Sequence, residues 1–257
     1  MKSIYLYLLC AVFLISSCEQ EKEMEQDART VFRYNESAGI TSLDPSFASN
    51  VENIWAVNQL FNGLVQMNDQ LEVEPCIAKS WEISDDGLTY TFHLRDDVYF
   101  HDHELFEGGK GRKVVASDFV HSLLRIVDPE VTSPGAWIFN NLDKSVDLGF
   151  SALDDTTLQI HILNPFPPFL GLLTMQYCSV IPYEIVEHYG RDFRNHPVGT
   201  GPFIFKIWKE GVKLIFMKNE NYFEVDEEGN SLPYLDAVSV SFLNDPQTAF
   251  LEFIKGD

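Results

Sequence analysis

Basic side chains are scarce in this sequence. Only 18 Lys and Arg stand against 39 Asp and Glu, so the formal charge is −21 at pH 7. Nucleic-acid binding needs clustered Lys and Arg against phosphates, so nucleic acid is excluded as the expected partner. The same charge disfavours binding to anionic lipid headgroups through the protein itself. With 45% hydrophobic and 13% aromatic residues, the remaining composition is that of an ordinary globular protein.

Cysteine is also rare, with four in the chain. Cys10 and Cys18 fall in the N-terminal segment, which leaves Cys76 and Cys178 in the remainder. They form no C-x-x-C pair and no metal-ligand spacing, so the sequence offers no cysteine-based metal site. In an oxidising compartment the two could pair. We expect two buried free thiols, with a disulfide as the open alternative.

The N-terminus has the layout of a secretory signal. Lys2 precedes an apolar run over residues 4–15, and two serines lead to Cys18. Such a run is too short to cross about 30 Å of hydrocarbon, which needs roughly 20 helical residues. We therefore expect residues 1–17 to be a signal peptide. The ending I-S-S-C resembles the lipobox of bacterial lipoproteins, whose cysteine thiol is lipidated; an ordinary cleaved signal and a retained membrane helix are the alternatives.

Residues 18–29 are polar and acidic and show no apolar period. A segment of this kind cannot bury enough surface to offset its ordering entropy, so we expect a flexible tether after a lipidated Cys18. Two or more acyl chains would hold the protein at a membrane surface without spanning it. The expected location is the cell envelope, with the protein lipid-anchored and facing the periplasm or the cell exterior. Which membrane holds the anchor stays open.

Apolar periodicity predicts a mixed α/β fold from residue 30 onward. Strands are expected at 31–34, 64–67, 81–84, 88–95, 98–100, 156–163, 203–207, 212–218 and 237–243. Helices are expected over 54–63, from Ser117 and Asp118 to Ile126, and over 246–255. Between two of these strands, residues 85–87 (DDG) are typical of a hairpin turn in which Gly supplies a positive φ.

Two segments could be mistaken for chemical sites. Residues 101–104 (HDHE) offer four metal ligands in a row, but on an extended chain only His101 and His103 would share a face. No distant H-x-x-H or C-x-x-C completes a shell, so we expect a solvated turn. Residues 108–111 (GGKG) lack the spacing of a phosphate-binding loop, and no G-x-S-x-G elbow occurs. We therefore predict no catalytic residue, no metal and no cofactor, and a metal-dependent hydrolase is the least favoured function.

The order of motifs resembles the family 5 extracellular solute-binding proteins of ABC importers, the oligopeptide-, dipeptide- and nickel-binding type. The matching segments are 42–45 (SLDP), 60–64 (LFNGL), 75–82 (PCIAKSWE), 86–95 (DGLTYTFHLR), 115–122 (VASDFVHS), 199–203 (GTGPF), 218–223 (KNENYF) and 253–257 (FIKGD). They follow one another in the family's order over nearly all of residues 31–257. One departure is residues 100–104 (FHDHE), where the family usually has W-x-D-G-x-P. It leaves the conformation of this loop open.

The resemblance implies the first lobe of a two-lobed periplasmic-binding-protein-like clamp that closes on a solute. It implies a discontinuous base over residues 30–48 and 180–257, with an inserted subdomain over 49–179. The chain would end before the second lobe, whether as a fragment or as a natural short form. In the family the peptide backbone is held as an added strand between the lobes.

By position, Ser49, Asn50 and Val51 match the family segment that lines the ligand backbone, and Gly135 and Trp137 match a segment that faces the cleft. The implied function is capture of peptides, or of a similar small solute, for ABC permease subunits, without catalysis. A lipoprotein sensor or chemoreceptor adaptor that uses the same clamp is the alternative. The identity and length of the ligand stay open.

Overall fold

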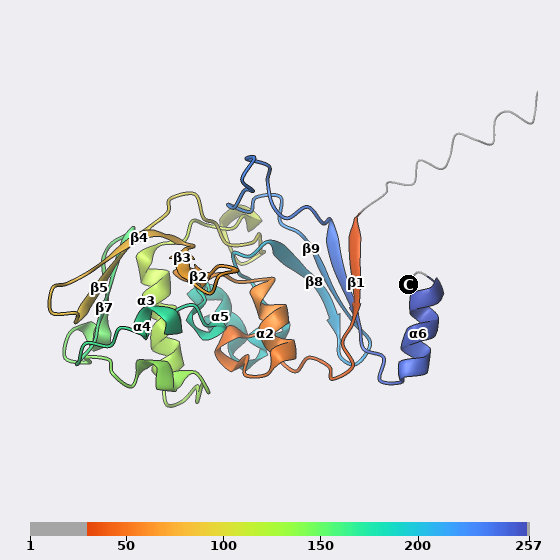
Figure 1. Ribbon diagram of the computed structural model, residues 1–257, viewed down its shortest axis with the longest axis horizontal. Helices are drawn as coiled ribbons and strands as arrows, with labels where there is room; N and C mark the ends of the chain where they lie inside the picture. Colours follow the sequence, from red (N-terminus) through yellow and green to blue (C-terminus); the bar gives the residue numbers. More distant parts are fainter. Residues whose placement is uncertain (1–29, 256–257) are drawn as a thin grey trace, which may run out of the picture. The chain divides into compact units, whose positions relative to one another are not determined.

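Two four-stranded sheets carry the fold in this computed structural model, which describes residues 30–255 (Figure 1). The mixed α/β expectation is confirmed. The predicted signal peptide, the lipidated Cys18 and the tether lie outside the described residues. Within residues 30–255, no helix has both the length and the apolar character that a bilayer crossing requires. The predicted division into a base and an inserted subdomain stays a prediction.

The first sheet joins distant parts of the chain. Its strands, in spatial order, are β1 (Val31–Asn35), β10 (Ala237–Ser241), β9 (Lys213–Lys218) and β8 (Phe203–Lys209). β1 pairs in parallel with β10, whereas β10, β9 and β8 are antiparallel. Parallel neighbours need a long connection, and here it runs through most of the molecule. Helix α6 (Pro246–Lys255) follows β10 and lies beyond β1 in Figure 1.

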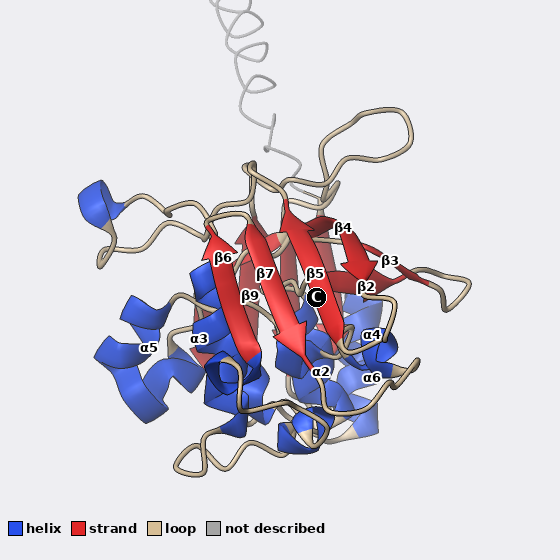
Figure 2. Cartoon of the chain, turned by 90° about the vertical axis from the view of Figure 1, so that its left-hand side faces the viewer, coloured by secondary structure: helices blue, strands red, loops and turns tan. Residues whose placement is uncertain are grey.

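The second sheet forms within the middle of the chain. It has the order β4 (Ala78–Ile83), β5 (Thr89–Leu94), β7 (Thr157–His161) and β6 (Phe150–Asp154), with antiparallel pairing throughout. β5 and β7 alternate buried and half-buried residues, as period-two patterning predicts. The buried side contacts helix α3 (Ala116–Val127), and Figure 2 shows the other face uncovered by any described element.

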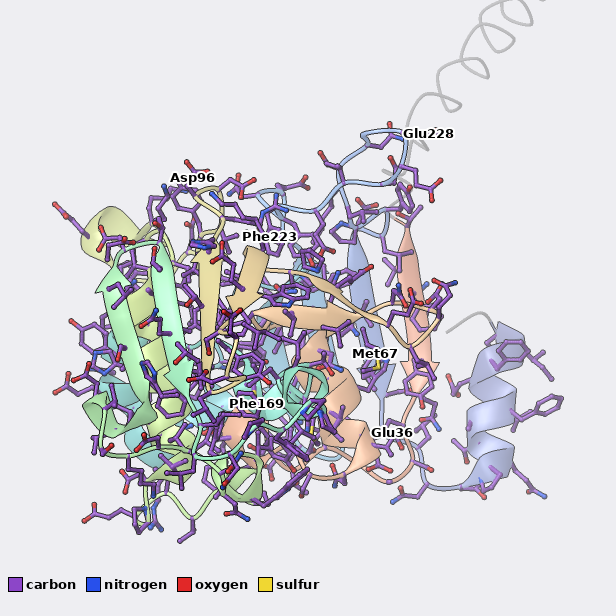
Figure 3. The ribbon with its side chains drawn as sticks, turned by 60° about the vertical axis from the view of Figure 1, so that its left-hand side comes forward. Glu36, Met67, Asp96, Phe169, Phe223 and Glu228 are labelled. Carbon is purple, nitrogen blue, oxygen red and sulfur yellow. The ribbon has the colours of Figure 1, made fainter. Side chains whose placement is uncertain are left out.

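Shorter elements lie between the two sheets in Figure 1. They are the hairpin β2 (Val65–Met67) and β3 (Val73–Pro75) and the helices α2 (Val51–Asn58), α4 (Phe169–Leu172) and α5 (Tyr183–Tyr189). The chain also forms 3-10 turns at Pro45–Phe47, Glu107–Gly109, Ala136–Phe139, Asp147–Gly149, Gln176–Cys178 and Gly190–Asn195. Phe169, labelled in Figure 3, packs edge-on against Tyr90 at 5.1 Å and against Phe139 at 6.3 Å between ring centroids. These rings join α4 to the second sheet in the core.

Three predicted elements differ from the structure. The helix expected over 54–63 begins at Val51, because the Asn50 side chain caps the Asn53 N–H at 3.0 Å, and it ends at Asn58. The strand expected at 98–100 is reduced to one bridge between Tyr99 and Lys113. Helix α3 begins at Ala116, ahead of Ser117, and the Asp118 carboxylate accepts a hydrogen bond from the Val115 N–H at 2.9 Å.

Candidate functional site

The turn that follows β1 leads to three of the predicted ligand-binding residues. Asp44 caps it, accepting a hydrogen bond from the Ser46 N–H at 3.0 Å, and Pro45 stands at its first position. Arg125 of α3 donates to both oxygens of the buried Asp44 carboxylate, at 2.9 and 2.6 Å. A bidentate pair of this kind fixes geometry as well as charge. The turn is therefore held rigidly to α3 just before Ser49.

A second segment carries the other two predicted residues. Gly135 is buried, and a Cβ built on it would lie 2.5 Å from Cγ of the Tyr177 ring. No larger residue fits without moving that ring. Trp137, in the 3-10 turn that follows, is 49% exposed. The segment thus presents one large aromatic side chain to solvent from a tightly packed backbone.

The structure brings the two segments together. The buried Ser133 hydroxyl donates to the Ser46 carbonyl oxygen at 2.6 Å and accepts a hydrogen bond from the Gly135 N–H at 3.1 Å. The buried Gln176 amide donates to the Ala48 carbonyl oxygen. Ser49, Asn50 and Val51 lie at the surface next to this junction. We call Ser49, Asn50, Val51 and Trp137 the rim; Gly135 belongs to its buried support.

The rim has free backbone groups. Across residues 30–255, neither the N–H nor the C=O of Ser49 forms a hydrogen bond with another part of the protein. Val51 is 76% exposed. Unpaired backbone groups at the surface are what an extended peptide needs in order to add itself as a strand. The rim is therefore chemically suited to backbone recognition, with Trp137 available for apolar or stacking contact.

A cavity of about 870 Å³ lies against the same turn. Its lining includes Phe47, and Arg125 faces it from α3. The wall also contains charged residues of both signs, namely Asp128, Glu130, Arg191 and Arg194. The Arg125 guanidinium is already engaged by Asp44 and Ser46. The wall offers no single charge that would select an ion.

In the segment 101–104, Asp102 and Glu104 are exposed, as expected of a solvated turn, but His101 is not, and the expectation is corrected at that residue. His101 is buried; its Nε2 lies 3.0 Å from the Gly201 carbonyl oxygen, and its Nδ1 lies 3.4 Å from the Gly199 nitrogen. Burial lowers the pKa of His101 to about 4, so the ring is neutral at pH 7. In the described part of the chain, no three His, Cys, Asp or Glu residues are placed to hold a metal ion.

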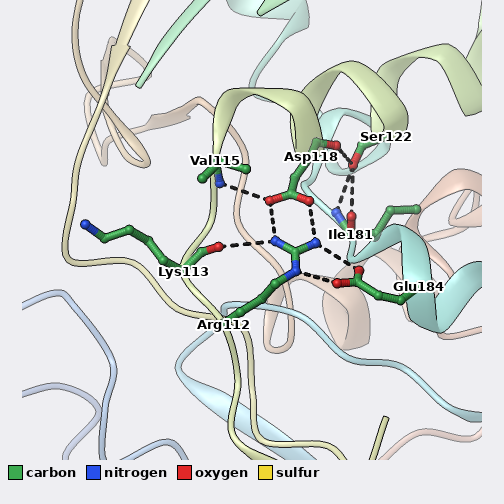
Figure 4. Close-up of polar contacts among 7 residues, drawn as sticks. All are labelled: Arg112, Lys113, Val115, Asp118, Ser122, Ile181 and Glu184. Carbon is green, nitrogen blue, oxygen red and sulfur yellow. Dashed lines mark hydrogen bonds and ion pairs between the residues drawn. The ribbon is translucent and has the colours of Figure 1, made fainter. Parts of the chain in front are cut away.

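A dense ionic cluster surrounds Arg112 (Figure 4). Its guanidinium donates to Asp118 at 2.8 and 2.6 Å, to both oxygens of Glu184, and to the Lys113 carbonyl at 3.2 Å. Burial alone would lower the pKa of Arg112, but the hydrogen bonds to Asp118 and Glu184 outweigh it and raise the pKa. All three guanidinium nitrogens are engaged, so this cluster ties a loop to α3 and α5 and leaves no evident donor for a ligand.

The two remaining cysteines are free and buried, as the sequence predicted. Burial raises the pKa of the Cys76 thiol to about 12, and it raises the pKa of Cys178 as well. Thiols held in this protonated state are poor nucleophiles and poor metal ligands. They are part of the core.

Comparison with known proteins adds the context that geometry alone does not supply. Residues 72–257 match the family model described as bacterial extracellular solute-binding proteins, family 5. Among curated proteins, the chain is 29% identical to the periplasmic murein peptide-binding protein MppA of Escherichia coli (strain K12), over 96% of this chain and 47% of that protein. It is 32% identical to the probable deoxycholate-binding periplasmic protein YgiS of the same strain, over 75% of this chain and 37% of that protein.

The fold is shared with a solved structure of the same kind. The ABC transporter-associated periplasmic binding protein DppA from Helicobacter pylori, in complex with the peptide STSA, superposes with a TM-score of 0.75 at 32% identity. The match covers 89% of this chain and 46% of that one. Such structural neighbours are two-lobed binding proteins, and an overlap of this size corresponds to one lobe. This chain therefore spans less than half the length of the relatives that it matches.

Proposed function

This chain belongs to the bacterial extracellular solute-binding proteins of family 5, and from that premise we propose that it captures a peptide or similar small solute for an ABC-type importer. The ligands named for its relatives include a murein peptide, deoxycholate (for a probable deoxycholate-binding protein) and the peptide STSA. Peptide is the ligand class that suits the rim best. The matched proteins are solute-binding proteins rather than enzymes, and we assign no catalytic step.

One observation carries the proposal. The unpaired backbone of Ser49 lies at the surface beside a junction that also supports the exposed Trp137. Backbone hydrogen bonding at Ser49 would supply affinity that does not depend on peptide sequence, and Trp137 would contact side chains. A second lobe, as in the two-lobed relatives, would close over the ligand and add most of the burial. The lobe described here would then bind more weakly than a complete clamp.

Isothermal titration tests the ligand class. Peptides of two to five residues, Ser-Thr-Ser-Ala among them, are titrated into the protein encoded by the complete gene, with deoxycholate as the non-peptide comparison. We expect heat with peptides. No heat with any peptide, together with binding of deoxycholate, would contradict peptide as the ligand.

A matched pair of variants tests backbone recognition. Ser49→Pro removes the N–H of residue 49, whereas Ser49→Ala removes only the hydroxyl and keeps that donor. One hydrogen bond contributes about 0.5–1.5 kcal/mol, so Ser49→Pro should weaken peptide binding by up to about tenfold. Ser49→Ala should bind as the unmodified protein does. Equal affinity for both variants would argue against an added strand at this position.

We also propose that Cys18 carries the lipid that holds the protein at the cell envelope. The support is the sequence around Cys18, together with the periplasmic names of the relatives. The test is expression in a bacterial host fed labelled palmitate, followed by mass spectrometry of the mature N-terminus. The protein should take up label and fractionate with membranes, and Cys18→Ser should abolish both. Unlabelled protein that begins at another residue would rule out the anchor.

A further inference from the structure

A single buried hydroxyl connects the two segments that form the rim. Ser133 is 6% exposed, and it bonds the Ser46 carbonyl on one segment and the Gly135 N–H on the other. We propose that Ser133 is the positioning residue that holds the two segments in one fixed arrangement, with Gln176 as its partner. The assignment of the rim as a ligand site rests on the proposed function, whereas the positioning is a property of the protein without ligand.

The first segment has little internal support of its own. Its backbone bonds run from Phe47 to Asp44 and from Ala48 to Pro45, and the next one runs from Ile54 to Asn50. Within residues 30–255, no backbone hydrogen bond therefore restrains Ser49, which lies between them. Restraint comes from other elements: Arg125 binds the side chains of Asp44 and Ser46, and two further side chains bind backbone carbonyls of this segment. The Ser133 hydroxyl donates a hydrogen bond to the Ser46 carbonyl, and the Gln176 side-chain amide donates one to the Ala48 carbonyl.

The second segment, around Gly135, packs against the same 3-10 turn that carries Gln176. Gln176 and Tyr177 are consecutive residues of one 3-10 turn. The Gln176 side chain holds Ala48, while the Tyr177 ring packs so closely on Gly135 that a Cβ there would overlap it. The turn at Gln176–Cys178 thus contacts both segments, through Ala48 and through Gly135. Ser133 links the two segments directly. A shift of one segment would move the other.

Removing the Ser133 hydroxyl breaks the hydrogen bonds between the two segments without creating a large cavity. In Ser133→Ala both the Ser46 carbonyl and the Gly135 N–H lose their partner, and a buried polar group without a partner is unstable. Both segments should therefore loosen together. A serine with a purely local role would loosen one segment. This difference separates a positioning residue from a residue that only stabilises its own turn.

Amide hydrogen exchange, measured by mass spectrometry on the protein without ligand, tests this directly. In Ser133→Ala we expect exchange at least about fivefold faster at the hydrogen-bonded amides of residues 46–48 and in peptides covering 134–138, with the second half of α3 unchanged. The matched control is Ser122→Ala. Ser122 is equally buried, donates to the Asp118 carbonyl at 2.6 Å and accepts from the Ile181 N–H at 2.9 Å. The control should leave the rim unchanged.

Three results would overturn the inference. They are faster exchange confined to 134–138, equal changes in the rim for Ser122→Ala, and no change at all. Ser133→Thr keeps the hydroxyl and should restore slow exchange in both segments. Should Ser133→Ala fail to fold, Gln176→Met removes only the bond to Ala48. That variant should speed exchange of the hydrogen-bonded amides at 46–48, and unchanged exchange there would equally count against the inference.

A binding measurement extends the test to function. Ser133→Ala should bind Ser-Thr-Ser-Ala about tenfold more weakly, and Ser122→Ala should bind as the unmodified protein does. Unaltered binding by Ser133→Ala would show that the link does not serve the ligand. If the unmodified protein binds no peptide, the proposed function fails. The exchange experiment still decides whether Ser133 joins the two segments.

Discussion

The two sheets differ in how completely they are covered. In the sheet β4–β5–β7–β6, alternate residues of β5 and β7 are buried, α3 packs against β6 and β7, and Phe92 of β5 is fully buried. At the β1 edge of the other sheet, Phe32 and Tyr34 are exposed, and α6 buries none of its residues against the described part of the chain. Both regions are rich in apolar side chains. Apolar side chains stabilise a fold only where a second layer removes them from water.

The difference implies that stability is unevenly distributed. The covered sheet and α3 should open only with global unfolding, whereas α6 should open locally. Four exposed apolar residues of α6, Phe250, Leu251, Phe253 and Ile254, are available to a further layer. Next to the rim, buried hydrogen bonds from Ser133 and Gln176 hold the backbone of Ser46 and Ala48.

The largest expected effect is a direct test of this contrast. Phe92→Ala leaves a cavity in the covered region and should lower the free energy of unfolding by about 3–5 kcal/mol. Phe253→Ala makes the same chemical change on α6, where the side chain is 77% exposed. It should change the free energy by no more than about 0.5 kcal/mol. Urea unfolding followed by circular dichroism gives both values, and similar losses would refute the contrast.

A charge pair from each region sharpens the same comparison. Asp118→Ala removes a carboxylate that is 2% exposed and bonded twice to Arg112. Breaking a buried pair costs about 3–5 kcal/mol, and because Arg112 is partly exposed we expect about 2–3 kcal/mol. Glu252→Ala breaks the Lys255–Glu252 pair on α6 and should cost no more than about 0.5 kcal/mol. Urea unfolding of the two variants measures both losses of free energy of unfolding. Equal losses would show that α6 packs more firmly than its exposure indicates.

Acid should loosen the junction where the loop after β5 meets the segment before β8. His101 binds Gly199 and Gly201 there, and burial lowers its pKa to about 4, against 6.5 in the unfolded chain. Between these values the unfolded state binds the proton and the folded state does not, so stability falls as the pH drops from 6.5 to 4. From pH 7 to pH 5 the loss should be about 2 kcal/mol.

The control for this pH effect is His101→Gln, which retains a hydrogen-bond donor but cannot titrate. Its free energy of unfolding, measured by urea titration, should fall by about 2 kcal/mol less between pH 7 and pH 5 than that of the unmodified protein. An identical pH dependence in both proteins would mean that His101 does not titrate as its burial requires. The acid sensitivity would then belong to other groups.

Periodicity was enough to predict many of the strands and helices, though not β3, β6, α4, α5 or the order of the strands in the sheets. β5, β7, β8, β9 and α6 lie where alternation or helical spacing placed them, because each has one face that differs from the other. The helix at Val51 began earlier than predicted because its start depends on the Asn50 cap rather than on apolar spacing. The burial of His101 was missed because its partners, Gly199 and Gly201, lie about a hundred residues away.

The candidate site was predictable in part. Resemblance singled out residues 49–51 and the segment around Gly135, and the structure places these segments side by side through Ser133 and Ser46. Their role in binding stays a prediction. Ser133, Gln176 and Arg125 were missed, because a buried polar side chain that supports a distant turn leaves no local pattern. A Ser-Pro-Gly turn is the one signal that could have marked Ser133.

The smallest expected effect concerns the two cysteines of the buried core. Cys76 and Cys178 are buried, and with a pKa of about 12 the Cys76 thiolate is a minute fraction at pH 8. Iodoacetamide should leave both unmodified in the folded protein and alkylate both in denaturant without reductant, as read by mass spectrometry of their peptides. Dithiothreitol should not shift the urea midpoint. Resistance to alkylation in denaturant, reversed by reductant, would instead reveal a disulfide and require the core around Cys178 to rearrange.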